Sequence, residues 1–410
     1  MSKKLFFVEY IHNYDEAGVG SQSEVILEEV PQNSQKDNGN GYVFQHIILD
    51  NPPVFKDLKR NVEEGHYVYY EDKVFYSAKN DPIANKRRRD NAKFRRQIRK
   101  ISESRSNTVS IEEGFTDKAS VFSYHVNVGH GNCTILLIQE DKRYEVWVVD
   151  CGEYDYLKHK SYKDNIEECL KDVAGKIGKP INDIRVSKLM ITHWHFDHVS
   201  GIEVLINKGI VNTDTILLAN MYYSFSSGCV NKLLKKFVKI KIRCYEPVAS
   251  LASLSSIRIL YPSVRLKKFG TWGGGFKIVK KVNNSSVVYS LELAGKRMIL
   301  PGDLENNGFN TMTSEPYCCP ALKECDYYCI SHHGSINGHI NIQCTSNPAK
   351  NVMACCRKKL KHAILMGRDK AYPGIYNPGV QASWGSYLRI SESAPHYLLL
   401  DWQTDNIYPR

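Results

Sequence analysis

The feature that most constrains this chain is a run of metal-binding residue types directly after an apolar, strand-like segment. Residues 193–198 read His-Trp-His-Phe-Asp-His. In an extended loop, side chains two positions apart point the same way, so His193 and His195 can bind one metal ion together. Asp197 and His198 then turn toward a second ion beside the first. Imidazole and carboxylate ligands favour zinc, with manganese or iron as alternatives.

Further candidate residues lie where other strands are expected to end. Asp150 follows the apolar residues Val148 and Val149, and Asp303 comes directly after Gly302. A third apolar strand is followed by two adjacent histidines, within residues 328–335. Each feature alone is typical of an ordinary turn, as an aspartate after a glycine often is. Together and in this order they indicate a site.

Residues 1–80 predict a small β-rich module. Strand-like runs at 5–10, 23–27 and 42–49 are separated by turn residues. Asn38-Gly39-Asn40-Gly41 supplies hairpin chemistry between two of them. The residues of this module do not indicate its function.

Residues 81–118 predict a basic helix and a polar linker. Lys86–Lys100 holds nine basic residues and one acidic residue, so its net +8 is most of the chain's formal charge of +11. Phe94 and Ile98 are four apart, which suits a helix with a thin apolar stripe. The charge favours a polyanionic partner, and a solvated basic face is the alternative. The expected nucleic-acid-binding residues here are Lys86, Arg87, Arg88, Arg89, Arg95 and Arg96.

From residue 119 to 410, strand-like segments alternate with helical ones, which predicts an α/β domain. The 12 cysteines are scattered without a CxxC spacing, so we expect reduced thiols in a cytoplasmic protein. No apolar run approaches the roughly 18 residues that cross a bilayer, so no membrane segment is expected.

On these residues the chain resembles the metallo-β-lactamase superfamily, whose fold is an αββα sandwich with a dinuclear metal site on one edge. The resemblance runs from about Tyr124 to the C-terminus. It is closest to the soluble nuclease-like domain of ComEC-type competence proteins. The matching elements are residues 125–132 (beside that group's DVGQGD), 193–198 (HxHxDH), 283–288 (NDNSLV), 302–303 (GD) and 332–335 (HHGS).

The resemblance implies a role for each matched residue. His193 and His195 would hold the first metal ion, Asp197, His198 and His332 the second, and Asp303 would bridge them. Asp150 would orient the histidine loop as a hydrogen-bond acceptor. His333 would bind metal or donate to substrate, and His332 is preferred as the ligand because the first histidine leaves the strand toward the site.

The chain also departs from that group's pattern. No histidine lies between His198 and Asp303, a position where β-lactamases proper supply a metal ligand. Residues 376–379 read Tyr-Asn-Pro-Gly where the ComEC group has a GHP element, and Asn127 replaces the aspartate of DVGQGD. The membrane channel that accompanies the ComEC domain is replaced by the N-terminal module and basic segment. DNA uptake is therefore not implied, although a bacterial origin is expected.

The implied activity is hydrolysis by a water activated between two divalent ions. A nucleic-acid phosphodiester is the favoured substrate, because of the HHGS type of site and the positive charge. The alternatives are a hydrolase of a small ester, thioester or lactone, and a non-catalytic sensor whose N-terminal module binds a partner. Catalysis is assigned to Asp197 and His333, and further substrate contacts to Asn283, Ser285 and Ser335. A second, thinner basic track (Lys232–Lys241) could also bind phosphates, but a solvated basic face is favoured there. The glycine-rich residues 270–275 predict a mobile loop beside the site that gates substrate entry or, equally, an ordinary surface turn.

Overall fold

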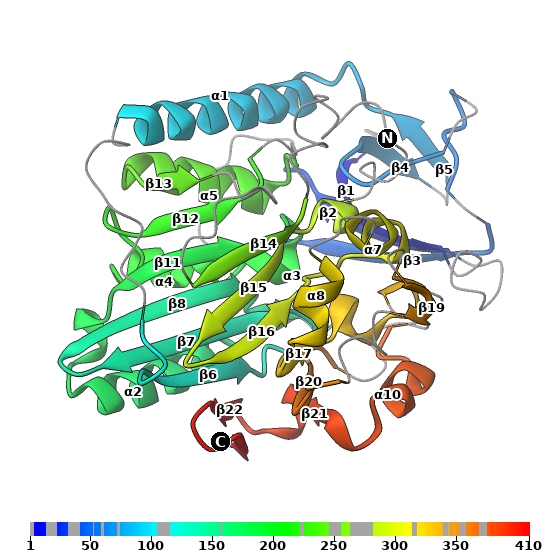
Figure 1. The fold of residues 1–410 in the computed structure, drawn as a ribbon. Coiled ribbons are helices and arrows are strands. Elements are labelled where there is room, and N and C mark those ends of the chain that lie inside the picture. Colours follow the sequence, from blue (N-terminus) through cyan, green and yellow to red (C-terminus); the bar gives the residue numbers. More distant parts are fainter. Residues whose placement is uncertain are drawn as a thin grey trace. The chain divides into compact units, whose positions relative to one another are not determined.

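The computed structural model (Figure 1) describes most of the chain. The described residues are 4–13, 23–31, 42–51, 53–58, 61–71, 74–104, 115–155, 158–221, 225–245, 256–262, 282–313, 318–338, 343–344, 347–351, 358–368 and 375–410. The chain forms two compact units: unit 1 is Met1–Gln97 with Ser224–Lys239, and unit 2 is Ile98–Tyr223 with Ile240–Arg410. A short segment from within the predicted third domain therefore groups with the N-terminal residues. The boundaries at residues 80 and 118 stay a prediction, and residues 38–41 and 270–275 lie outside the described residues.

Unit 1 is built on an antiparallel five-stranded sheet of order β3-β2-β1-β4-β5, which confirms the predicted β-rich N-terminal region. Its strands are β1 Leu5–Asn13, β2 Ser23–Glu29, β3 Phe44–Leu49, β4 Tyr67–Glu71 and β5 Val74–Ser77. Phe6 and Val8, two apart on β1, are buried in one cluster with Leu27 and Phe75. This alternation is what a sheet with one covered face requires.

Helix α1, Pro82–Ser104, contains the predicted basic segment. Its start is fixed by Asp81, whose Oδ1 accepts hydrogen bonds from the backbone N–H groups of Ile83 (2.8 Å) and Ala84 (2.9 Å), with Pro82 at the first helical position. The helix also takes in residues 102–104, which the sequence predicts as linker. The Ser102 hydroxyl donates to the Ile98 carbonyl (2.9 Å), so this serine is satisfied inside the helix.

Unit 2 contains an eight-stranded sheet of order β13-β12-β11-β8-β7-β6-β22-β23 and a six-stranded sheet of order β14-β15-β16-β17-β20-β21. The first comprises β6 Ser120–Val126, β7 Cys133–Glu140, β8 Arg143–Cys151, β11 Val186–Ile191, β12 Ile216–Ala219, β13 Arg243–Tyr245, β22 Tyr397–Asp401 and β23 Asn406–Pro409. The second comprises β14 Ile257–Tyr261, β15 Val288–Leu293, β16 Lys296–Leu300, β17 Tyr327–Cys329, β20 His362–Leu365 and β21 Leu388–Ile390. Short two-stranded pairs add β9 Tyr154–Asp155 with β10 Lys160–Ser161, and β18 Gln343–Cys344 with β19 Asn347–Asn351.

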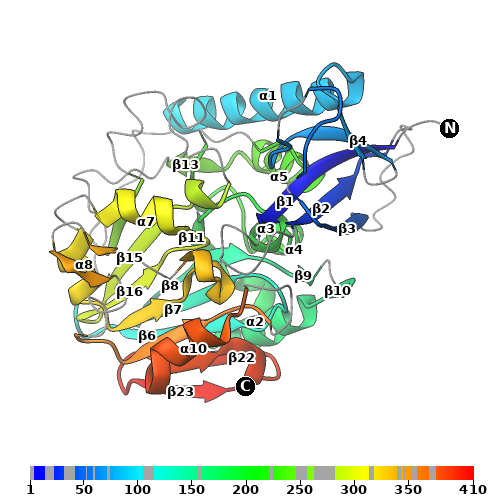
Figure 2. The same cartoon turned by 90° about the vertical axis from the view of Figure 1, so that its right-hand side faces the viewer.

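The two sheets pack face to face and helices cover their outer faces, so the predicted αββα sandwich is confirmed (Figure 2). Trp147 and Val149, two apart on β8, share one buried cluster with Met298 of β16. The helices of unit 2 are α2 Lys163–Ile177, α3 Phe196–Val199, α4 Ile202–Asn207, α7 Asn306–Thr313, α8 Cys318–Lys323 and α10 Pro378–Trp384. Across the described parts of both units, no helix combines the length and the apolar character that crossing a membrane requires.

Candidate metal centre

The histidine run begins in the loop after strand β11 and continues into helix α3, which holds Asp197 and His198. Trp194 is fully buried and its indole N–H donates to the Asn220 carbonyl (2.7 Å), which anchors one side of the loop. His193 and His195, on either side of Trp194, lie together: Nε2 of His193 is 3.1 Å from Nδ1 of His195. Two imidazole nitrogens at this distance are arranged as ligands of one ion would be.

Four buried side chains form a cluster that could hold a metal ion. One ligand atom from each of Asp197, His198, Asp303 and His333 lies within 4.8 Å of the others. Nε2 of His333 is 3.2 Å from Asp197 Oδ2 and 3.4 Å from Asp303 Oδ2. Nε2 of His198 is 3.3 Å from Asp303 Oδ1. Residues from the ends of β11, β16 and β17 thus meet at one edge of the sandwich.

The second ring nitrogen of each histidine in this cluster is held by an acceptor. Nδ1 of His198 is 2.8 Å from Asp150 Oδ2, and Nδ1 of His333 is 3.1 Å from the Met366 carbonyl. A carbonyl oxygen accepts only, so Nδ1 of His333 carries a proton that it donates. Both rings therefore present Nε2 to the cluster, which is the arrangement that metal-binding histidines adopt. The residues present fit a divalent ion.

Asp150 ties the strand β8 to the start of the histidine loop. Its Oδ1 accepts from the Thr192 backbone N–H (2.8 Å), and its Oδ2 accepts from the Thr192 hydroxyl (2.7 Å) as well as from His198. Asp150 has a φ of 53°, a left-handed conformation that turns its carboxylate back over the loop. The carboxylate thus orients His198 through direct contact.

Charge within the cluster is balanced between carboxylates and imidazoles. Burial lowers the pKa of His198 and His333, but the carboxylates of Asp303 and Asp197 outweigh it, so the pKa of His198 lies well above its ordinary value and that of His333 is raised to about 9. Burial raises the pKa of both aspartates, yet the neighbouring imidazoles hold both well below their ordinary range. A divalent cation bound here would also stabilise the ionised carboxylates.

For the other two histidines, His193 and His195, the effect of burial prevails and the pKa is lowered. Burial lowers the pKa of His193 well below its ordinary value, with the charge of His198 adding to the effect. It lowers the pKa of His195 to about 4. Both rings are therefore neutral at pH 7 and have a lone pair available for a metal ion.

The structure brings His333 rather than His332 into the four-residue cluster. The strand before them ends at Cys329, and His332 and His333 have φ values of 50° and 49°. The alternation of side chains that favours the first histidine holds only in extended backbone, so it does not apply to this left-handed turn. His332 lies instead with Nε2 3.3 Å from the Asn283 amide nitrogen.

His130 and Glu305 also lie at this site, although the sequence analysis did not single them out. Nε2 of His130 is 3.6 Å from Asp197 Oδ2, and its ring centroid is 4.4 Å from that of His333. Glu305 accepts from the side-chain amides of Asn283 and Asn284, each at 3.1 Å. His130 could have been singled out from the sequence, because it occupies the position of the polar glutamine in the similar DVGQGD element.

The candidate substrate residues of unit 2 are buried. Asn283, Ser285 and Ser335 are 1%, 0% and 0% exposed. The Ser285 hydroxyl donates to the Val282 carbonyl (2.6 Å), and the Ser335 hydroxyl accepts from the Asn337 backbone N–H (3.3 Å). The two serines thus stabilise local turns, and Asn283 lies closest to the histidines.

The basic residues of α1 divide into two groups. Arg95 is 4% exposed and its Nε donates to the Asn91 side chain (2.7 Å), while Arg87 pairs with Glu28 (2.9 Å). Both stabilise unit 1, so they differ from the outward-facing track that the sequence predicts. Of the residues predicted to bind nucleic acid, Lys86, Arg89 and Arg96 are exposed and Arg88 is half-buried; Lys93 and Lys100 of the same helix are exposed as well.

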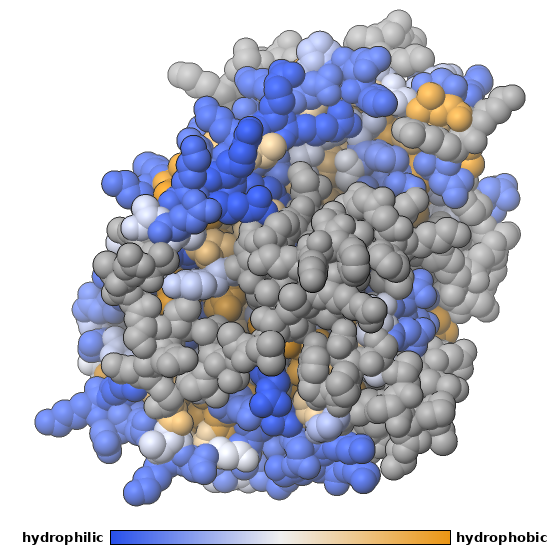
Figure 3. Space-filling model, turned by 45° about the horizontal axis from the view of Figure 1, so that its top comes forward, coloured by the Kyte–Doolittle hydropathy of each residue, from blue (hydrophilic) through white to orange (hydrophobic). Residues whose placement is uncertain are grey.

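The second track lies on and after helix α5, Gly228–Lys239. The helix buries Val230, Leu234 and Phe237 on one face, and its lysines occupy the other, as in an ordinary amphipathic surface helix. In Figure 3, which brings the top of the view in Figure 1 forward, many of the coloured residues along the upper part are hydrophilic.

The sandwich and its buried histidine–aspartate cluster define an α/β protein with a candidate metal site at the strand ends. The sequence model of the metallo-beta-lactamase superfamily matches residues 173–389, and the chain belongs to this superfamily. Its members are hydrolases and typically bind divalent metal ions. A comparison with curated proteins found no match.

Solved structures with a similar fold share little sequence with this chain. A diphosphatase of the PhnP family is 11% identical, with 69% of this chain and 97% of that chain covered and a TM-score of 0.36. The metallo-beta-lactamase fold protein YhfI from Bacillus subtilis is 10% identical, with coverages of 69% and 99% and a TM-score of 0.35. The short form of human tRNase Z is 12% identical, with coverages of 62% and 95% and a TM-score of 0.32.

Proposed function

We propose that this chain is a metal-dependent phosphodiesterase that cleaves nucleic acid. The observation that carries the metal chemistry is the pair of preset histidines: Nδ1 of His198 and of His333 each meet an acceptor, and both Nε2 atoms face Asp197 and Asp303. Buried groups held in this way have the geometry of metal ligands.

The two ions are assigned to two sets of ligands. Asp197, His198 and His333 would hold one ion and His193 with His195 the other, with Asp303 shared between them; zinc is favoured, and manganese or iron are alternatives. His333 thus replaces His332 in the assignment. When bound, the ions would supply an activated water and polarise the scissile ester.

The protein's own residues position this site. Asp150 orients His198, and the Met366 carbonyl orients His333. Asn283 donates from its amide to Glu305 and lies against His332. Burial of the whole cluster keeps bulk water away, which strengthens each interaction with a charged substrate.

The choice of a nucleic-acid phosphodiester is supported by sequence and charge. The HHGS element and the run at 193–198 resemble the nuclease-like domain of ComEC-type proteins, and the net charge of +11 favours a polyanion. Lys86, Arg89 and Arg96 are exposed cations on one helix that could neutralise phosphates. A bacterial, cytoplasmic enzyme is part of this proposal.

Cleavage of labelled single- and double-stranded DNA and RNA, with added zinc or manganese, tests the proposal. Wild type is compared with Asp197→Ala/His198→Ala, and with Asp214→Ala/His159→Asn, a matched pair of exposed residues. We expect metal-dependent cleavage that only the first double variant abolishes. Hydrolysis of p-nitrophenyl acetate by metal-loaded protein that leaves every nucleic acid intact would contradict it in favour of a small-ester hydrolase. Binding of metal without hydrolysis of either would indicate a sensor.

A further inference from the structure

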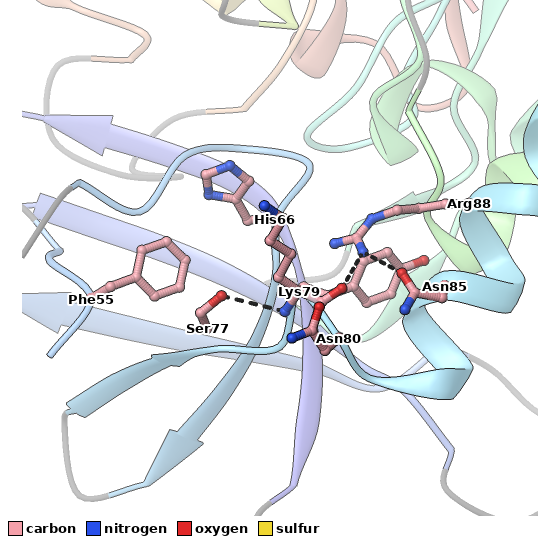
Figure 4. A pocket seen from close by; sticks show the side chains of 8 residues that line it. Phe55, His66, Ser77, Lys79, Asn80, Asn85 and Arg88 are labelled. Carbon is pink, nitrogen blue, oxygen red and sulfur yellow. Dashed lines mark hydrogen bonds between the residues drawn. The ribbon is translucent and has the colours of Figure 1, made fainter. Parts of the chain in front are cut away.

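Unit 1 contains a cavity of about 490 Å³ whose lining residues all belong to that unit (Figure 4). It lies where strands β4 and β5 meet the first turns of α1. Figure 4 shows Phe55 and His66 at one end of it, and Arg88 and Asn85 of α1 at the other. Its volume is within the range of about 300–1,000 Å³ that small-molecule sites occupy. A single inorganic ion would fill only part of it.

The cavity is cationic because its two positive side chains have no carboxylate partner among the described residues. Arg88 donates only from Nη1, to the Lys79 carbonyl (3.3 Å) and to Asn85 Oδ1 (3.1 Å), and both acceptors are neutral. The Lys79 side chain is exposed and forms no ion pair with a described residue. Arg87, one position earlier on the helix, is instead neutralised by Glu28 (2.9 Å).

The acidic residues around the cavity are engaged elsewhere. Asp57 accepts from the Ser77 backbone N–H (3.1 Å), and Asp81 caps α1 and accepts from the Tyr69 hydroxyl (2.6 Å). Glu63 lies 3.8 Å from His66, so it compensates the imidazole and leaves the arginine and lysine uncompensated. Among the residues that the structure describes, no aspartate or glutamate lines the cavity. An anion entering it would therefore meet attraction from two cations.

Aromatic and amide groups complete the lining. The ring that the cavity exposes is the His66 imidazole, whose side chain is 30% exposed, whereas Phe55 and Tyr67 are each 1% exposed, with the Arg88 guanidinium 4.9 Å from the Tyr67 ring centroid. Asn80 and Asn85 bring side-chain amides, which can both donate and accept hydrogen bonds. Ring surface with neighbouring amides suits a planar heterocycle, and a guanidinium beside an ammonium suits a phosphate.

A second cavity, in unit 2, also has cationic lining residues, but carboxylates lie beside them. It measures about 390 Å³ and is lined by Lys296, Arg297 and Lys359, but also by the carboxylates of Asp117, Glu292 and Glu324. There Arg297 pairs with Glu292 (2.7 Å) and Lys359 lies 3.7 Å from Glu324. Cations that are already paired offer little to an anionic ligand. The cavity of unit 1 differs in having its cations uncompensated.

We propose that this cavity binds a nucleoside phosphate, with the phosphate at Arg88 and Lys79 and the base against the His66 ring and the asparagine amides. The ligand comes either as a free mononucleotide or as the terminal nucleotide of a strand. This binding is independent of the proposed hydrolysis, because every residue it uses belongs to unit 1.

Calorimetric titration of the full chain tests this assignment with four probes: adenosine 5′-monophosphate, adenosine, inorganic phosphate and a 5′-phosphorylated tetranucleotide. We expect the monophosphate to bind with a Kd on the order of 0.1 mM, and adenosine and phosphate each at least about tenfold more weakly. Tighter binding of the tetranucleotide assigns the site to strand ends, and tighter binding of the monophosphate assigns it to a free nucleotide. Equal affinity for phosphate and monophosphate would overturn the nucleoside part.

Substitutions of the cationic lining residues test whether the monophosphate binds in this cavity. Arg88→Gln and Lys79→Gln should each weaken the monophosphate by about tenfold, since each removes a charge-assisted hydrogen bond. Lys79 is exposed, so its variant leaves folding intact even if the loss of Arg88 does not. Lys93→Gln is the matched control, an exposed cation on the same helix outside the cavity, and should stay within twofold of wild type. No binding by wild type, or equal binding by all four proteins, would overturn the proposal.

Discussion

Nδ1 of His333 lies 3.1 Å from the main-chain oxygen of Met366, a residue that follows a different strand of the same sheet. His333 belongs to the turn after β17, and Met366 comes after β20, which pairs with β17 in parallel. The tautomer of a metal-site histidine is thus set by backbone and not by a side chain. Substitution of Met366 would leave this carbonyl in place, whereas a change in the backbone beside it would move the acceptor.

Gly367→Ala makes such a backbone change. Gly367 has a φ of 123°, and a Cβ there would lie 2.9 Å from Cβ and 3.2 Å from Nδ1 of His333. Because neither the conformation nor the space suits alanine, we expect the variant to lose metal affinity by about tenfold or more, as metal sites do when an orienting partner is disturbed. Competition with a chromophoric zinc chelator measures this. Gly175→Ala is the control, since a Cβ there meets nothing within 4 Å; equal affinity in both variants would refute the role of the carbonyl.

Asp150→Asn tests the other orienting contact. The carboxylate accepts from Thr192 and from Nδ1 of His198, and an amide offers only one oxygen for these donors. We expect zinc affinity to fall by about 10- to 100-fold while the metal ligands stay in place. The same chelator competition reports it, with Asp214→Asn as the exposed counterpart. Affinity within twofold of wild type would show that Asp150 does not orient the ligand.

The strands that position the site could be predicted from the sequence, because apolar runs and their ends follow local rules. β11 spans Val186–Ile191, the same segment that the sequence predicts. The choice between His332 and His333 could not be predicted, because it depends on two left-handed φ values that form only when the turn packs. His130 reaches Asp197 across 67 positions of sequence, a proximity that only the tertiary fold creates.

Which basic residues of α1 are buried could not be predicted from the sequence either. Which arginines of α1 face outward depends on what packs against the helix, and local sequence does not contain that information. Arg95 lies beside Asn91, whose amide donates to the Phe225 carbonyl (2.8 Å) in a segment distant in sequence. A positive run therefore predicted the helix and its charge but not its buried face.

The stability of unit 2 should depend on pH through Glu145. Burial raises the pKa of this carboxyl, but the attraction of Lys188 (2.7 Å) and hydrogen bonds from Lys188, Trp147 and Arg143 outweigh it and lower the pKa to about 2. The folded pKa is below the unfolded value of about 4.5, so the stabilisation is complete above pH 4.5 and is lost as the pH falls toward 2.

Urea unfolding of wild type and Glu145→Gln at pH 7 and pH 4 measures this effect. The difference in unfolding free energy between the two proteins should shrink by about 1 kcal/mol at the lower pH, after allowance for partial solvent exposure. Contributions from other titrating groups cancel in the double difference. A difference that is the same at both pH values would mean that Glu145 titrates alike in the folded and unfolded chain.

Arg87 and Arg89 of α1 should contribute to different properties, Arg87 to the stability of the fold and Arg89 to nucleic-acid binding. Arg87 is 21% exposed and pairs with Glu28, which is 2% exposed and also accepts from the Gly228 backbone N–H (2.9 Å) at the start of α5. Removing the guanidinium leaves a buried carboxylate without its cation, so Arg87→Ala should lower the unfolding free energy by about 2–3 kcal/mol. Arg89 is exposed, and Arg89→Ala should change it by less than about 0.5 kcal/mol.

The affinity for nucleic acid should depend on the exposed arginines of α1 and not on Arg87. Arg89→Ala combined with Arg96→Ala removes two exposed cations, so the affinity for DNA or RNA should fall and the slope of log K against log salt should decrease in magnitude by about 1–2. Fluorescence anisotropy between 50 and 200 mM salt measures the slope, and Arg87→Ala serves as the comparison at a temperature where it remains folded. If the slope of the double variant equals that of wild type, the exposed face of α1 does not contact phosphates, and the positive charge of the helix is a solvated surface.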